Sequence, residues 1–175
     1  MPRAAAAVIV LLLAALALTA DQLSKAAAIA NLPPGEPVSI LGEFLYFQLV
    51  RNPGAAFSLG EGVTWVFTLA LLAVAVIIVV LACTRIRSWL WAVVLGLLLG
   101  GVLGNLTDRL FREPGFPVGH VVDFLSTPWM LPAIYNVADM FIVTMMITVA
   151  LLVLLGVNFA GHRERASRRD DTGVS

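Results

Sequence analysis

Four long apolar stretches dominate this sequence, and they restrict it to a fold that lies within a membrane. They cover residues 4–30, 63–83, 89–107 and 138–160. A helix needs about twenty residues to cross the hydrocarbon core of a bilayer. Only 13% of the residues are charged, whereas about a quarter are charged in a typical soluble domain. We therefore predict an α-helical integral membrane protein with four transmembrane helices, forming a single domain over residues 1–161.

The first apolar stretch has a second interpretation as a secretory signal peptide. Arg3, the apolar run and the small residues Ala15 and Ala17 are typical of such a leader. However, the apolar pattern resumes as AAAIA after Asp21, and Asp21 and Lys25 are four residues apart. Residues at this spacing can pair on one face of a continuing helix. We therefore predict that the segment is a retained helix.

The distribution of basic residues predicts how the helices are oriented. If the N-terminus is cytoplasmic, seven of the eleven Lys and Arg residues lie on the cytoplasmic side. Basic residues are enriched in cytoplasmic loops of membrane proteins. Both termini are therefore predicted to be cytoplasmic, together with a charged tail over residues 162–175.

This orientation brings the unusual polar residues to one face of the membrane. Ionisable residues within or beside membrane helices are costly and are usually functional. In this chain they all fall at the extracytoplasmic ends of the helices or in the connection between the last two. They are Asp21, Lys25, Asn105, Asp108, Arg109, Asp123 and Asp139. We therefore expect a functional site at the extracytoplasmic surface.

Two outer connections and one glycine series complete the predicted layout. FLYFQLV followed by RNPG favours a small β-hairpin or sheet on the membrane surface, within residues 36–60. Residues 110–137 contain four prolines, which argue against a long helix and predict a second outer loop over the site. Gly96, Gly100 and Gly104 recur every four residues and predict close packing of a neighbouring helix.

Composition limits the chemistry that the site can perform. The net charge is zero, so no basic surface predicts nucleic-acid binding. Cys83 is the single cysteine, which excludes an internal disulfide and a cysteine-based metal cluster. His120, the one outer histidine, has no nearby His or Cys for a zinc site. Mg²⁺ or Ca²⁺ bound by several carboxylates remains possible, although Lys25 and Arg109 could supply the positive charge instead.

Asp123 and Asp139 could form a catalytic pair. Two carboxylates held close together share a proton, because both cannot ionise cheaply. One can then activate water as a general base while the other polarises a carbonyl and protonates the leaving amine. Asp139 follows Asn136 by three positions at a predicted helix start. For Asp139 alone, a helix-capping role would be the better explanation, and it is the second acid that favours catalysis.

Five short motifs resemble, in order and spacing, the signature blocks of bacterial lipoprotein signal peptidase, a family also called signal peptidase II. They are DQLSK (21–25), NPGAAFS (52–58), GGVLGNLTDR (100–109), VVDF (121–124) and YNVAD (135–139). The last block usually begins with Phe, whereas this chain has Tyr135. That aromatic exchange leaves Asn136 and Asp139 in place.

The resemblance implies an intramembrane aspartic endopeptidase with Asp123 and Asp139 as its catalytic dyad. The implied substrate is a prolipoprotein whose Cys carries diacylglycerol, cut just before that Cys in the bacterial cytoplasmic (inner) membrane. Membrane lipid is the other expected partner, and no metal, cofactor or obligate protein partner is expected. Arg109 is expected to pair with a carboxylate. The residues implied to line or support the site are Asp21, Lys25, Asn52, Gly54, Asn105, Asp108, Arg109 and Asn136.

Two other classes of protein remain open at this point. A proton-coupled transporter would carry ionisable residues near the middle of the bilayer, whereas the inner halves of the predicted helices carry no Asp, Glu, Lys or His. A non-catalytic membrane scaffold would need only the helices and the glycine series. The scaffold predicts that Asp123→Asn and Asp139→Asn are silent, and the peptidase predicts that both abolish cleavage.

Overall fold

The computed structural model describes residues 1–54 and 63–162, and it contains four long helices and a small sheet. The helices are α1 (Arg3–Asn31), α2 (Thr64–Thr84), α3 (Trp89–Phe111) and α4 (Val137–Leu154). Each is long and apolar enough to cross a membrane, which confirms the four predicted helices, although α4 ends at Leu154 and not at residue 160. Residues 55–60 of the predicted β region and 163–175 of the predicted tail lie outside the described residues.

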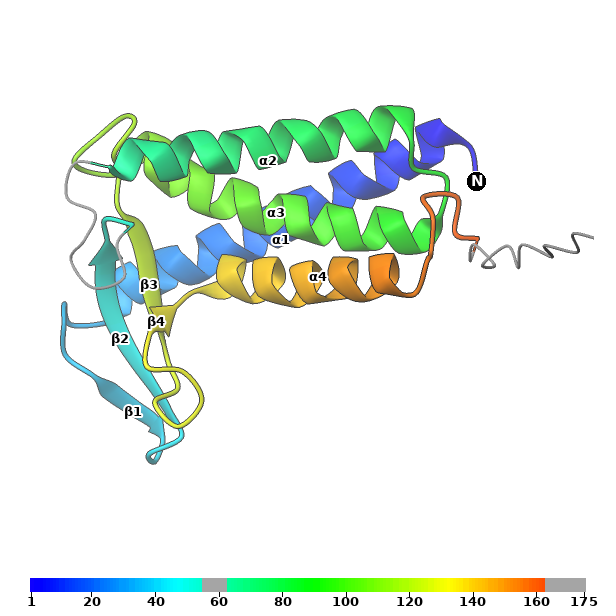
Figure 1. Ribbon diagram of the computed structural model, residues 1–175. Coiled ribbons are helices and arrows are strands. Elements are labelled where there is room, and N and C mark those ends of the chain that lie inside the picture. Colours follow the sequence, from blue (N-terminus) through cyan, green and yellow to red (C-terminus); the bar gives the residue numbers. More distant parts are fainter. Residues whose placement is uncertain (55–62, 163–175) are drawn as a thin grey trace, which may run out of the picture.

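Helix α3 is the central helix of the bundle (Figure 1). In its most apolar window 72% of residues are buried, compared with 11% in α4. The predicted glycine series explains how α1 approaches so closely. A Cβ atom added to Gly100 would lie 2.5 Å from Cβ of Ala17, and one added to Gly96 would lie 3.0 Å from Cβ of Leu13. The helix that packs closely against these glycines is therefore α1.

Four antiparallel strands form the sheet in the order β1-β2-β3-β4. They are β1 (Val38–Leu41), β2 (Leu45–Asn52), β3 (Val121–Ser126) and β4 (Ile134–Tyr135). The predicted small sheet is confirmed, but the second outer connection is not only a loop, since it supplies β3 and β4. Strand β3 pairs with β2, with Val50 opposite Asp123. A partner about seventy residues away in sequence leaves no local turn signal, so sequence periodicity missed this pairing.

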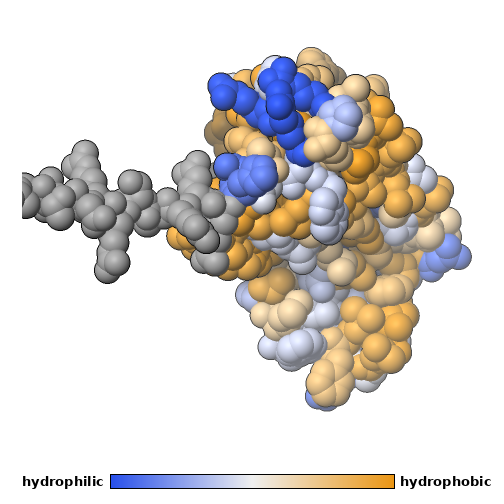
Figure 2. All heavy atoms as spheres, turned by 90° about the vertical axis from the view of Figure 1, so that its right-hand side faces the viewer, coloured by the Kyte–Doolittle hydropathy of each residue, from blue (hydrophilic) through white to orange (hydrophobic). Residues whose placement is uncertain are grey.

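The sheet and the chain termini lie at opposite ends of the bundle. Figure 1 shows the strands running across one end of the helices, whereas the N-terminus and the last turn of α4 lie at the other. Exposed Arg3, Arg85 and Arg87 belong to this second end. A view of that end shows hydrophilic side chains gathered beside hydrophobic helix flanks (Figure 2).

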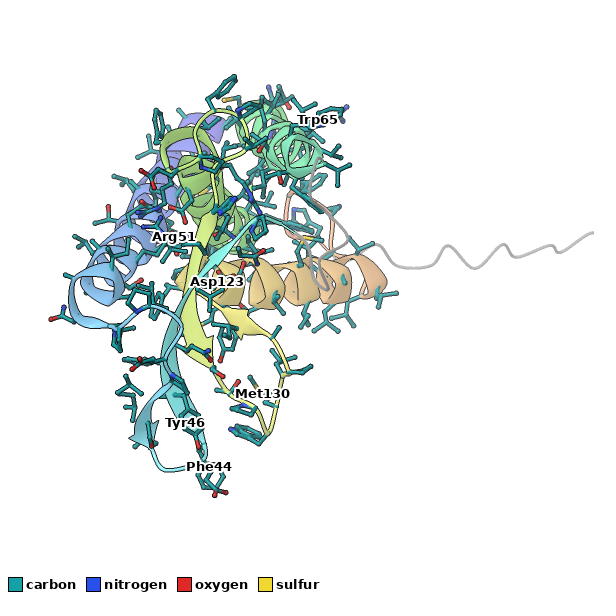
Figure 3. All side chains as sticks on the ribbon, turned by 90° about the vertical axis from the view of Figure 1, so that its left-hand side faces the viewer. Phe44, Tyr46, Arg51, Trp65, Asp123 and Met130 are labelled. Carbon is teal, nitrogen blue, oxygen red and sulfur yellow. The ribbon has the colours of Figure 1, made fainter. Side chains whose placement is uncertain are left out.

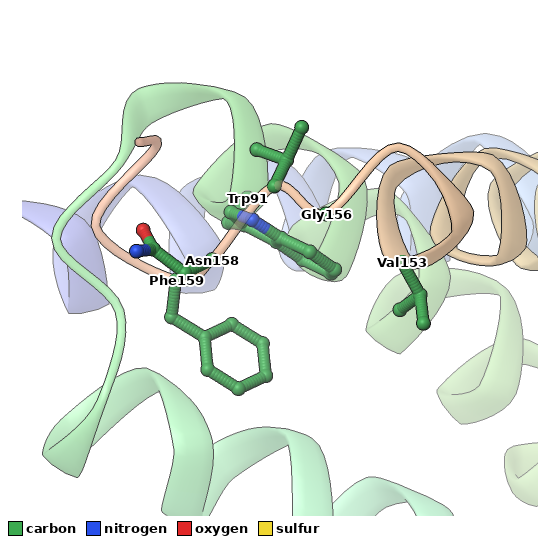
Figure 4. Close-up of a pocket in the computed structure, with 6 residues that line it drawn as sticks. Trp91, Val153, Gly156, Asn158 and Phe159 are labelled. Atoms are coloured by element: carbon green, nitrogen blue, oxygen red, sulfur yellow. The ribbon is translucent and has the colours of Figure 1, made fainter. Parts of the chain in front are cut away.

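A small pocket also lies at the end that is remote from the sheet (Figure 4). Its volume is about 260 Å³, and Trp91, Val153 and Phe159 are among its lining residues. The rings of Trp91 and Phe159 meet edge to face with centroids 4.8 Å apart. The side chains that line this pocket include no acid, base or nucleophile, so the pocket itself offers no catalytic group.

Candidate active site

Asp123 lies on β3 at the junction of the sheet with the helices (Figure 3). Its side chain is 3% exposed, and both carboxylate oxygens accept short hydrogen bonds from side-chain amides. Nδ2 of Asn136 donates to one oxygen at 2.6 Å, and Nδ2 of Asn52 donates to the other at 2.8 Å. The pairing of β2 with β3 brings Asn52 and Asp123 together, because both lie on these neighbouring strands.

Asp139 occupies the first turn of α4 and is half-buried. It forms a capping box with Asn136: the Asn136 side chain accepts from the Asp139 amide at 3.0 Å, and Asp139 Oδ2 accepts from the Asn136 amide at 3.1 Å. The capping role considered from sequence is therefore real. It occupies only one oxygen, since Oδ1 accepts a hydrogen bond from Nδ2 of Asn105 at 2.8 Å.

Asn105 and Asn136 connect the two carboxylates. Asn136 donates to Oδ1 of Asn105 at 3.2 Å as well as to Asp123. The same Asn105 oxygen accepts from Nζ of Lys25 at 3.0 Å. Because both partners of this oxygen are donors, the amino group of Asn105 must point toward Asp139. Two acids from different elements are thus joined through two amides of fixed orientation.

The surroundings of Asp123 favour its protonated form. Burial raises the pKa of Asp123 from its ordinary value of 3.8 to about 6, and the nearby charge of Asp139 acts in the same direction, whereas hydrogen bonds from Asn52 and Asn136 oppose the shift. Desolvation penalises a carboxylate, and a neighbouring acid penalises it further. Asp123 therefore holds a proton up to a pH of about 6, where an ordinary aspartate is already ionised.

A buried ion-pair cluster, formed by Asp21, Lys25, Asp108 and Arg112, lies next to the two acids. Nζ of Lys25 is 2.8 Å from Asp21 and 2.8 Å from Asp108, and all three side chains are fully buried. Arg112 adds a second cation, with Nε 2.6 Å from Asp108. Two cations thus balance two carboxylates, which a buried cluster requires. The predicted pairing of Asp21 with Lys25 on one helix face is confirmed.

The cluster also joins four elements to one another. Asp21 on α1 accepts from the backbone amide of Ala138 on α4 at 2.9 Å. Asp108 on α3 accepts from the amide of Val122 on β3 at 3.1 Å. Val122 and Ala138 each precede a candidate catalytic acid by one residue. The positions of Asp123 and Asp139 therefore depend on this cluster.

Arg109 does not pair with a carboxylate among the described residues, which corrects the expectation from sequence. Its Nη1 donates to the carbonyls of Asn52 at 3.2 Å and Gly119 at 3.0 Å. Asp108, its sequence neighbour, faces Lys25 instead. Gly54 has a φ of +105°, and a Cβ there would lie 2.8 Å from Nη2 of Arg109. Glycine at this position lets the chain pass the guanidinium, so Arg109 joins α3 to the segments beside β2 and β3.

Two residues of the site were missed from sequence. Gln22 donates to Asp21 at 3.1 Å and to Asp108 at 3.2 Å, and Arg112 pairs with Asp108. Arg112 could have been found, because it follows Asp108 by four positions on one helix. Gln22 had no comparable signal, because it is neutral and its contact with Asp108 joins residues far apart in the sequence.

Neither His120 nor a metal-binding group belongs to the site in the part of the chain that the structure describes. His120 is half-buried in the outer segment and lines an open pocket with Arg51, Glu113 and Pro114, away from the bridged acids. Within residues 1–54 and 63–162, no group of three or more His, Cys, Asp or Glu side chains is arranged to hold a metal ion. The acids of the site contact amides and cations instead.

The fold and the site together define a multi-helix membrane protein with two amide-bridged carboxylates at one end of its bundle. Comparison with known proteins places it more narrowly. The family model described as Signal peptidase (SPase) II matches residues 13–155. This chain belongs to the signal peptidase II family.

Several relatives carry the name lipoprotein signal peptidase. The protein of Leifsonia xyli subsp. xyli is 53% identical over 145 residues, which are 83% of this chain and 66% of that protein. The Rhodococcus jostii protein is 46% identical, covering 87% of this chain and 75% of its own length. The Mycobacterium avium protein is 44% identical, with coverages of 93% and 89%.

Two solved structures have a similar fold. One, described as a bacterial membrane enzyme at 2.3 Å resolution, matches with a TM-score of 0.74 at 24% identity, covering 90% of this chain and 94% of its own. Another, described as a bacterial membrane enzyme at 1.9 Å, matches with a TM-score of 0.72 at 26% identity, with coverages of 83% and 92%. The four-helix arrangement with a small sheet is thus that of a known membrane enzyme.

Proposed function

We propose that this chain is an aspartic endopeptidase that removes the signal peptide from diacylglyceryl-modified prolipoproteins. It cuts the peptide bond N-terminal to the lipidated Cys. The observation that carries the proposal is the amide-bridged pair of Asp123 and Asp139, which come from different elements and meet at one end of the helices. The names of the relatives point to the same class of substrate.

The roles of the two acids follow from their environments. Asp123 is the more buried acid and has the raised pKa, so it carries the shared proton. Ionised Asp139 takes a proton from water as the water oxygen attacks the scissile carbonyl carbon. Asp123 gives its proton to the carbonyl oxygen. The amine then leaves with the proton that Asp139 took from water, and a hydroxyl of the tetrahedral intermediate returns its proton to Asp123 as the product carboxyl group forms, so the pair again holds one proton, on Asp123.

The location of the acids suits a substrate that is anchored in lipid. The charged side chains of the described helices lie near the end that carries the sheet, with Arg3 as the exception. We place this end at the extracytoplasmic face of the bacterial cytoplasmic membrane, where a diacylated precursor presents its scissile bond. A transporter would instead need charged groups along a path through the bilayer.

The test is cleavage of a diacylglyceryl-modified prolipoprotein by the purified full chain in lipid, followed by gel shift. Asp123→Asn and Asp139→Asn should each lower the rate by at least about a hundredfold, the lower end of what positioned acid–base groups contribute. Glu36→Gln, which changes an exposed outer acid, is the matched control and should cleave normally. The unlipidated precursor should stay intact.

Two results would oppose the proposal. Undiminished cleavage by either aspartate variant would exclude the dyad. Failure of the folded wild type to cleave a substrate with verified lipidation would favour the transporter or the scaffold.

A further inference from the structure

The end of the sheet that is farthest from the helices exposes a cluster of large apolar side chains, which we call the apolar tip. Its members are 46–67% exposed, and the proposed reaction uses none of them. They come from β1, from the turn that follows it, and from the connection between β3 and β4. They are Ile40, Leu41, Phe44, Trp129, Met130 and Leu131.

Specific contacts hold the two halves of the apolar tip together. Nε1 of Trp129 donates to the carbonyl of Phe44 at 2.9 Å, and the two rings meet edge to face with centroids 6.4 Å apart. The amide of Phe44 donates in turn to the carbonyl of Leu41 at 2.9 Å. Figure 3 shows Phe44 and Met130 at the same end of the sheet. These rings are fixed in an outward position.

An exposed apolar cluster of this size indicates a partner, because soluble surfaces rarely carry one. The place of the apolar tip identifies that partner as lipid. The sheet runs across the end of the bundle and projects past α4 (Figure 1). Only Asn136 separates the end of β4 from the start of α4. Beside this start α4 exposes Met140 and Val143, which face lipid in a spanning helix. The apolar tip lies to the side of the bundle, at the level of the helix ends, and so extends the lipid-facing surface of α4.

The charges around the apolar tip favour an apolar contact over an electrostatic one. Residues 38–46 and 127–135 contain Glu43 and no Lys, Arg or His. Trp and Tyr are the side chains enriched where membrane meets water, and Trp129 and Tyr46 lie here. Binding should therefore need no anionic lipid, in contrast to a basic segment attracted to acidic headgroups.

We infer that the apolar tip is a membrane anchor, which places Phe44, Trp129 and Met130 among the lipids of the leaflet on the sheet side. The sheet then has two attachments to the bilayer: the helices at one end and the apolar tip at the other. Strand β3 lies between these attachments, so the anchor holds Asp123 at a constant height above the hydrocarbon core. This inference rests on the membrane fold and holds whether or not the proposed cleavage is correct.

The experiment measures the depth of a nitroxide label in the full chain. Cys83→Ala removes the native thiol, and single cysteines are then introduced by Met130→Cys, Val143→Cys or Arg51→Cys. Each protein is labelled, placed in phosphatidylcholine vesicles, and probed for collisions with oxygen and with a water-soluble nickel chelate. Val143 on α4 is the lipid reference, and exposed Arg51 on β2 is the aqueous reference.

We expect the label at Met130 to resemble that at Val143, with oxygen collisions favoured over the chelate. Adding Phe44→Ser with Trp129→Gln should shift Met130 toward the Arg51 behaviour and leave Val143 unchanged, which also shows that the helices remain folded. A label at Met130 that behaves like Arg51 in pure lipid would overturn the anchor and indicate a protein partner instead. If the double substitution left the depth of the label at Met130 unchanged, the anchor would be overturned as well. No readout depends on cleavage.

Discussion

The side chain of Asn105 has one carbonyl and one amino group, and each makes hydrogen bonds to different neighbours. The carbonyl oxygen accepts from Lys25 and Asn136, so the amino group is left for Asp139. Asn136 is fixed in the same way, because its oxygen accepts from the Asp139 amide and its nitrogen donates to Asp123. The ammonium of Lys25 therefore acts on Asp139 through Asn105, without touching it.

Replacement of Lys25 should damage both stability and catalysis. Lys25→Met leaves Asp21 fully buried without its cation, and breaking a buried ion pair typically costs about 3–5 kcal/mol. The variant should unfold at a lower temperature than wild type in the same detergent. Cleavage should also fall, because Asn105 loses one of the two donors that orient its amide.

A second substitution can separate these two effects. Adding Asp21→Asn to Lys25→Met removes the uncompensated charge, so part of the lost thermal stability should return. Cleavage should stay low, because Asn105 still lacks its ammonium donor. If activity recovered together with stability, Lys25 would act through stability alone, and its positioning role would be wrong.

The pH dependence of cleavage should report the protonation of Asp123. Since its pKa is raised to about 6 and the proposed reaction needs it protonated, kcat/KM should fall as pH rises through about 6. The hydrogen bond from Asn52 favours the ionised form. Asn52→Ala should therefore raise this pKa further and move the falling limb to higher pH, by about one unit for a hydrogen bond to a charged group.

The matched control for this profile is Gln48→Ala. Gln48 lies on the same strand, but its side chain is directed to the carbonyl of Gly35. Its profile should coincide with wild type. A limb that moved to lower pH in Asn52→Ala would contradict the assigned roles of the two acids.

At the scale of elements, the glycines of α3 set how closely α1 can pack. A Cβ on Gly100 would lie 2.5 Å from Cβ of Ala17 and 2.7 Å from the carbonyl of Ala14. Neither neighbour can move without shifting α1, so Gly100→Ala should destabilise by about 1–3 kcal/mol through overpacking. Thermal unfolding in detergent measures this.

Gly96→Ala serves as the graded comparison. Its nearest contacts would be 3.0 Å, and alanine gains up to about 1 kcal/mol of helix propensity over glycine. The net change should therefore be small. Equal losses of thermal stability in Gly100→Ala and Gly96→Ala would show that the shorter contacts at Gly100 do not determine how closely α1 packs.

The helices could be predicted from sequence because length and apolar content alone specify a spanning helix. The acids could be located because polar residues stand out in such a background. Other features depend on contacts between distant elements. Strand β3 needs β2 as its partner, and Arg109 contacts backbone carbonyls that no spacing reveals. The orientation of the Asn105 amide likewise follows from Lys25, eighty residues away.

At the scale of the whole molecule, the charges are divided between two ends. Exposed Arg3, Arg85 and Arg87 lie at the end of the termini, whereas exposed Arg51, the buried ion-pair cluster and both candidate catalytic acids lie toward the sheet. The described residues contain four helices that could span the membrane, and an even number returns the end of the last helix to the side where the first begins. By sequence, seven of the eleven Lys and Arg residues fall on the side of the termini, so the positive-inside rule predicts that this end is cytoplasmic and that the sheet is outside.

Cysteine labelling in sealed, right-side-out vesicles tests this orientation. The native Cys83 is exposed near the end of α2, so a membrane-impermeant maleimide should react with it only after the vesicles are opened. In Cys83→Ala with Glu36→Cys, an exposed position between α1 and β1 outside the apolar tip, the same reagent should react with intact vesicles. The reverse pattern would place the sheet in the cytoplasm. The carboxylate pair would then stand on the wrong side of the membrane to cut a precursor that has already been translocated and lipidated, and the proposed substrate would have to be abandoned even if the fold were unchanged.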